Sequence, residues 1–176
     1  MELTKKDKTI KYVIYCLIIL FAGILQNVSG LWFTSGNARC FFLIPVCVLL
    51  GINEDEKNAA LLGFFGGLIW DAVSSSHMGF NCIFLMLACY ISSAFVVFVF
   101  RNTFLLGLIE AVVTIAVYVF VYWILFVLIK SSEGAGIALG KFYIPCMLYT
   151  MAMTPIIYYI LSPVKDRLNK AQQLEK

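Results

Sequence analysis

The chain has 176 residues, of which 62% are hydrophobic and 13% are charged, and its mean hydropathy is +0.93. Soluble domains are roughly 45–50% apolar and about 25% charged, so this composition excludes a soluble globular protein. The net charge of +3 is too small and too dispersed to indicate nucleic-acid binding. The long apolar runs are continuous, whereas the strands of a membrane β-barrel alternate over segments of about ten residues. We therefore expect an all-α integral membrane protein.

Six apolar segments predict a bundle of six transmembrane helices that forms one domain over residues 1–176. In chain order the segments are residues 12–29, 40–53, 58–73, 80–100, 103–129 and 142–161. A helix that crosses a bilayer at right angles needs about 20 residues, and the second and third segments are shorter. These two segments could extend into their polar flanks or form a partly re-entrant pair.

The basic residues predict the orientation of the bundle. With six spans, ten of the 13 lysines and arginines lie on the side of the two termini, and only Arg39, Lys130 and Lys141 lie on the other side. Because cytoplasmic loops carry the excess of lysine and arginine, we expect both termini in the cytoplasm. An odd number of spans would move the basic C-terminal tail outside, so the charge pattern also favours an even number.

The third predicted span carries a stripe of small residues that ends in an acid. Ala59, Gly63, Gly67 and Asp71 are spaced by four residues and share one helix face. Small residues let a second backbone approach closely, and a carboxylate among apolar residues in a membrane costs roughly 2.5–3.5 kcal/mol on insertion-based scales. Two interpretations stay open. The face packs inside its own bundle, with Asp71 bonded to a nearby donor, or it docks another protein, a ligand or an ion.

Glu110 is the second acid within a span. Asp71 lies about 13 residues from the cytoplasmic start of its helix, or roughly 20 Å in, whereas Glu110 lies about seven residues, or roughly 10 Å, from its own. This offset argues against a pair that shares one proton. We expect each acid to face a polar neighbour in the bundle or on a partner, and Glu110 could also reach the cytoplasmic surface. Pro155, inside the last span, predicts a helix kink.

The residues that usually carry catalysis or metal binding form no recognisable pattern. The six cysteines contain no Cys-x-x-Cys pair, and we interpret them as small apolar residues. His77 is the single histidine and has no neighbouring Cys or Asp pattern for a metal, so we expect it in an interfacial loop. No phosphate-binding glycine loop or nucleophile elbow occurs. We therefore expect no catalytic site, no bound metal and no cofactor.

One segment of the chain resembles a known family. The pattern Gly63-x-x-x-Gly67-Leu68-x-x-Asp71, followed by a short polar turn and Met78-Gly79-Phe80-Asn81, resembles the MreD family of bacterial rod shape-determining proteins. The basic N-terminal tail, the chain length, the acidic second loop and Pro155 before a basic tail fit the same family. One departure is that the second span opens without the proline expected there.

The resemblance implies a non-enzymatic, multi-pass protein of the bacterial inner membrane. It would work in the lipid bilayer with MreC and, indirectly, with MreB, RodA and the elongation penicillin-binding transpeptidase, without nucleic acid or a small-molecule substrate. Gly63, Gly67 and Asp71 would be helix-packing or partner-docking residues, and Gly79 would serve the turn into the fourth span. The family also implies a six-helix fold similar to the substrate-binding subunits of energy-coupling-factor transporters.

Such a vitamin-binding subunit is the alternative function. It would need a ligand cavity of aromatic and polar side chains near the outer face. The candidates for that cavity are Trp32, Trp70, His77, Asn81 and Tyr122. Those subunits carry an Ala-x-x-x-Ala stripe in their first span, which the residues 21–26 of this chain lack. The sequence therefore favours the shape-determining function.

Overall fold

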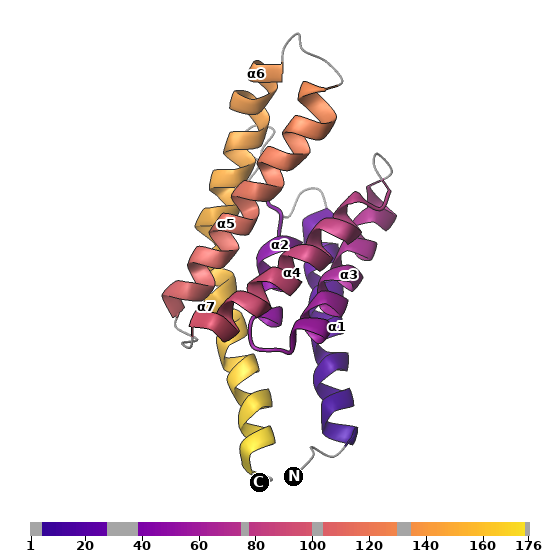
Figure 1. Ribbon diagram of the computed structural model, residues 1–176, viewed down its shortest axis with the longest axis vertical. Helices are drawn as coiled ribbons and strands as arrows, with labels where there is room; N and C mark the ends of the chain where they lie inside the picture. Colours follow the sequence, from indigo (N-terminus) through magenta and orange to yellow (C-terminus); the bar gives the residue numbers. More distant parts are fainter. Residues whose placement is uncertain (1–4, 28–38, 75–77, 100–103, 130–134, 175–176) are drawn as a thin grey trace.

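The computed structural model describes residues 5–27, 39–74, 78–99, 104–129 and 135–174, and these are almost entirely helical (Figure 1). The first four helices are α1 (Lys5–Asn27), α2 (Leu43–Gly51), α3 (Glu56–Val73) and α4 (Phe80–Val99). Helix α5 (Phe104–Trp123) continues into the π-helical turn η1 (Ile124–Leu128). The last helix is made of α6 (Ala135–Ala138), the π-helical turn η2 (Leu139–Tyr143) and α7 (Ile144–Leu174). The described residues contain no strand, and the prediction of an all-α membrane bundle with six helices is confirmed.

Three helical stretches within the described residues are long and apolar enough to cross a membrane. They are Lys8–Asn27, Phe104–Leu128 and Ala135–Lys165, and Phe80–Val96 forms a shorter apolar helix. The last helix begins before the predicted segment at residues 142–161 and runs past it. Pro155 lies inside this helix, and the kink that we expect there stays a prediction.

The two termini lie at the same end of the bundle, and α6 lies at the opposite end (Figure 1). The even number of spans that the charges predict stays a prediction. The assignment of that side to the cytoplasm stays a prediction. Three of the charges on which it rests, Arg101, Lys130 and Lys176, lie outside the described residues.

Helix α2 is shorter than the predicted second segment at residues 40–53, and side chains of other helices bind the backbone where it begins. The amide of Phe41 donates to Thr150 Oγ1 at 3.0 Å, and the amide of Leu43 donates to Gln26 Oε1 at 3.0 Å. Pro45 sits in the first helical turn, where its missing N–H leaves no bond unmade. With nine residues, α2 is about 14 Å long, too short to cross the roughly 30 Å core of a bilayer.

Helix α2 forms the centre of the bundle. All nine of its residues are buried, as expected for a helix that is apolar on every side, and α1, α3, α4, α5 and α7 pack around it. At its C-terminus the carbonyl oxygen of Leu49 accepts a hydrogen bond from Lys165 Nζ at 2.5 Å. A cation at this end complements the helix dipole. The last helix is thereby tied to the centre of the bundle.

A buried polar cluster follows α2 in the loop toward α3. Glu54 Oε1 lies 2.5 Å from Lys11 Nζ, and Glu54 Oε2 accepts a hydrogen bond from Tyr12 Oη at 3.0 Å. The backbone carbonyl of Glu54 accepts a hydrogen bond from Ser93 Oγ at 2.6 Å. Lys11 and Glu54 are only 6% and 9% exposed. The loop is therefore anchored to α1 on one side and to α4 on the other.

Removing one member of this buried ion pair should be costly. We expect Lys11→Met to lower the free energy of unfolding by about 3–5 kcal/mol, because it leaves the Glu54 carboxylate buried without its cation. Thermal unfolding in detergent measures the effect, and Lys8→Met, at an exposed position on the same helix, is the matched control. The double variant Lys11→Met/Glu54→Gln should lose less than the single variant. An equal loss in the single and double variants would contradict this account of the pair.

Candidate functional site

The small-residue stripe of α3 packs against the backbone of α4. A Cβ atom added at Gly63 would collide with the carbonyl group of Leu85, and one added at Gly67 would collide with the backbone of Cys82. Neither position has room for a side chain, so the two helices touch backbone to backbone. The glycine face is thus occupied from within the chain. Docking of another protein on this face would require α3 and α4 to separate.

Asp71 joins the end of α3 to the beginning of α4. Its Oδ2 accepts hydrogen bonds from the amides of Gly79 at 3.0 Å and Cys82 at 3.1 Å, and its Oδ1 accepts one from Asn81 Nδ2 at 2.8 Å. The first amides of a helix have no partner within the helix, and the helix dipole favours a negative charge at that end. Asp71 therefore caps α4 from a neighbouring helix, and these bonds offset the cost of burying its side chain, which is 5% exposed.

Gly79 provides the backbone geometry that this cap needs. Its φ is +94°, in the left-handed region that favours glycine, and a Cβ there would meet nothing within 4 Å. Glycine is thus required for its conformation and not for space. The turn directs the Gly79 amide toward Asp71.

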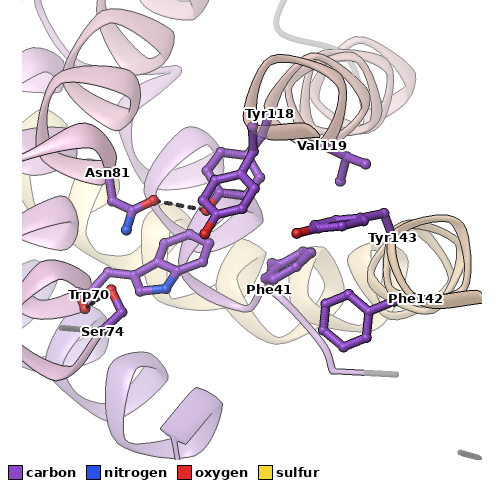
Figure 2. A pocket seen from close by; sticks show the side chains of 9 residues that line it. Phe41, Trp70, Ser74, Asn81, Tyr118, Val119, Phe142 and Tyr143 are labelled. Atoms are coloured by element: carbon purple, nitrogen blue, oxygen red, sulfur yellow. Dashed lines mark hydrogen bonds between the residues drawn. The ribbon is translucent and has the colours of Figure 1, made fainter. Parts of the chain in front are cut away.

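Asn81 extends the connection to a third helix. Its Oδ1 accepts a hydrogen bond from Tyr118 Oη on α5 at 2.8 Å (Figure 2). Its Nδ2 donates to Asp71. The two partners fix the orientation of the amide, because Tyr118 donates and the carboxylate only accepts. Asp71, Asn81 and Tyr118, which we call the Asp71 network, link α3, α4 and α5. All three side chains are buried.

An aromatic cavity of about 140 Å³ lies beside the Asp71 network. The rings of Trp70 and Tyr118 are 5.1 Å apart between centroids, and Phe41 lies 5.6 Å from each of them. Figure 2 shows Tyr143 facing Phe41. The remaining lining residues are Ser74, Asn81, Val119, Tyr122 and Phe142. Pockets for drug-sized ligands are roughly 300–1,000 Å³, so this cavity has room for only a small group.

The structure brings together some of the residues singled out from the sequence. Trp70, Asn81 and Tyr122, named for a vitamin site, do line the aromatic cavity, whereas Trp32 and His77 lie outside the described residues. Within the described residues no group of three or more His, Cys, Asp or Glu side chains could hold a metal ion.

Glu110 is not part of the Asp71 network. It lies on α5 and lines a separate groove between α4 and α5. The two acids have no hydrogen-bond partner in common among the described residues, and the expected offset in depth between them stays a prediction.

Sequence reasoning missed Tyr118, Phe41 and the Lys11–Glu54 pair. Tyr118 has one available signal, because it follows Ala111, Thr114 and Ile115 at helical spacing and so shares their face. For Phe41 and Lys11 no local signal exists, since their partners come from distant parts of the chain.

The comparisons with known proteins identify one family. The family model described as rod shape-determining protein MreD matches residues 6–164 of the chain. No curated protein and no solved structure matches it.

Proposed function

The chain belongs to the MreD family of rod shape-determining proteins, and we propose that it is a non-catalytic membrane scaffold of the cell-elongation complex. In this role it regulates cell shape and lateral peptidoglycan synthesis together with MreC. A multi-pass position in the bacterial inner membrane, with both termini in the cytoplasm, is part of the proposal. MreB, RodA and the elongation penicillin-binding transpeptidase are indirect partners.

The single observation that supports a scaffold best is the use of Asp71. Both of its carboxyl oxygens accept hydrogen bonds from the same chain, and its neighbour Asn81 is engaged at both ends of its amide. A catalytic acid or base must keep an oxygen within reach of the group that it protonates or deprotonates. Both oxygens of Asp71 are instead hydrogen-bonded to groups at the start of α4, and these bonds join α3 to α4. Such a group maintains a shape that a partner recognises.

Co-purification with MreC tests the proposal. We expect tagged MreC, expressed together with this chain, to retain it through detergent extraction and size-exclusion chromatography. A second membrane pair of known stability, purified in parallel, shows whether the detergent preserves complexes. Loss of this chain from MreC while the reference pair survives would count against the scaffold.

The aromatic cavity gives one reason to test the transporter alternative. A vitamin-binding subunit should be stabilised by its ligand, because a ligand that binds only the folded state raises the melting temperature, Tm. We expect no Tm change across a panel of vitamins, since the cavity of about 140 Å³ is smaller than pockets that hold ligands of that size. A saturable rise in Tm with one vitamin would favour the transporter function instead.

A further inference from the structure

The aromatic cavity beside the Asp71 network is lined mainly by aromatic rings. Six of its nine lining residues are aromatic, and they come from the segment before α2, from α3, from α5 and from η2. Figure 2 shows Phe41 and Tyr143 facing each other, with Trp70 and Tyr118 beside them. Rings from four separate parts of the chain thus surround a hollow that their own side chains leave unfilled.

The size of the cavity limits the group that it can hold. Its volume is about 140 Å³. An apolar cavity of about 150 Å³ engineered into another protein holds one benzene molecule. The space therefore suits a compact group of about six or seven non-hydrogen atoms.

The electrostatics of the lining favour a positive group over a negative one. The face of an aromatic ring carries the negative part of its quadrupole, so several rings around one hollow attract a cation. None of the nine lining side chains is basic. The Asp71 carboxylate lies directly behind Asn81, 2.8 Å from its amide nitrogen, and adds negative potential on that side. The nearest basic residues along the chain, Arg39 and Lys141, are exposed and do not line the cavity.

The hydrogen-bonding groups of the cavity favour a cation that needs no acceptor. The amide of Asn81 is engaged at both ends, and the hydroxyl of Ser74 donates to the carbonyl oxygen of Trp70. A primary ammonium brings three N–H donors, and each of them needs an acceptor when it is buried. A quaternary ammonium has no N–H donor, and aromatic cages recognise such groups through cation–π contacts.

We propose that the aromatic cavity binds a quaternary ammonium group, held by cation–π contacts with the rings around it. A trimethylammonium group has the size and the charge that the cavity accepts. This group occurs on small soluble molecules and on the phosphocholine head group of lipids. Binding at this site goes beyond the scaffold role and does not depend on it.

Thermal unfolding of the purified protein with choline tests the charge of the ligand. Choline should raise the Tm saturably, because a ligand that binds only the folded state stabilises it. The matched control is the neutral carbon analogue of choline, in which a tert-butyl group replaces the trimethylammonium group. The apparent affinity for choline should be roughly tenfold or more above that for the analogue. Equal stabilisation by the two compounds overturns the proposal.

Variants of the last helix test whether the ligand sits in the cavity. Tyr143→Leu removes one ring of the lining and should lower the apparent affinity for choline roughly tenfold, whereas Tyr143→Phe keeps the ring and should keep most of the affinity. Tyr159→Leu makes the same change on α7 at a position that is 82% exposed and does not line the cavity, so it should leave the affinity unchanged. If Tyr143→Leu does not fold, Phe142→Leu removes a neighbouring ring of the same lining.

Reconstitution in lipid bilayers separates the two sources of the group. Stabilisation by choline in detergent assigns the site to a soluble molecule. Stabilisation by phosphatidylcholine but not by choline, measured against phosphatidylglycerol bilayers and lost in Tyr143→Leu, assigns it to a lipid head group. If neither choline nor phosphatidylcholine raises the Tm, or if Tyr143→Leu responds as the wild type does, the proposal is wrong. Co-purification with MreC is unaffected by these outcomes, so the scaffold function is judged separately.

Discussion

Asp71→Ala should destabilise the folded protein by about 3–5 kcal/mol, because three donors, two of them buried and one partly buried, lose their acceptor at once. Each unsatisfied buried donor costs about 1–3 kcal/mol, and local relaxation makes the total smaller than the sum. The loss should lower the Tm by roughly 10 °C in detergent. Cells whose only copy of the gene carries this change should lose their rod shape.

Asp71→Asn separates charge from hydrogen bonding. Its single oxygen can still accept from the amides of Gly79 and Cys82, and its amide nitrogen can donate if Asn81 turns over and Tyr118 then accepts. We expect a loss of about 1–2 kcal/mol, well below that of the alanine variant. Asp55→Ala, at an exposed acid before α3, is the matched control and should change the Tm little. An alanine variant as stable as the wild type would show that the cap of α4 contributes nothing.

Gly67→Ala should disrupt the close contact between α3 and α4. The added Cβ would lie 2.6 Å from the carbonyl oxygen of Asn81, and the atoms in its way are backbone, which cannot rotate aside as a side chain does. The helices α3 and α4 must then separate, and the bonds between Asp71 and the start of α4 lengthen. We expect a loss at or above the upper end of the usual range for overpacking, about 1–3 kcal/mol.

A matched glycine shows whether this effect comes from the contact. Gly136→Ala changes a helical glycine at which an added Cβ meets nothing within 4 Å, so it should be neutral or raise the Tm slightly. Thermal unfolding and the cell-shape assay are run on both variants. If Gly67→Ala and Gly136→Ala behave alike, the backbone contact between α3 and α4 is not needed for stability.

The sequence by itself determined the class of the protein, most of its helices and its family. Composition and continuous apolar runs are sufficient for an all-α membrane protein, since only helices satisfy their backbone over such runs in lipid. The spacing of Gly63, Gly67 and Asp71 placed them on one face, because helical geometry is local. The same residues, with Gly79 and Asn81, carried the resemblance that the family match confirms.

Only the tertiary structure shows which helix packs against each of these helix faces. Periodicity shows that Gly63 and Gly67 share a face but does not identify α4 as the neighbour, and hydropathy does not distinguish burial in protein from exposure to lipid, because both surroundings are apolar. Because hydropathy does not make this distinction, the sequence of α2 predicts a transmembrane span, although α2 is a nine-residue helix buried in the bundle. The partners of Asp71 and the absence of one for Glu110 among the described residues follow from contacts between separate helices, and no local pattern encodes these contacts.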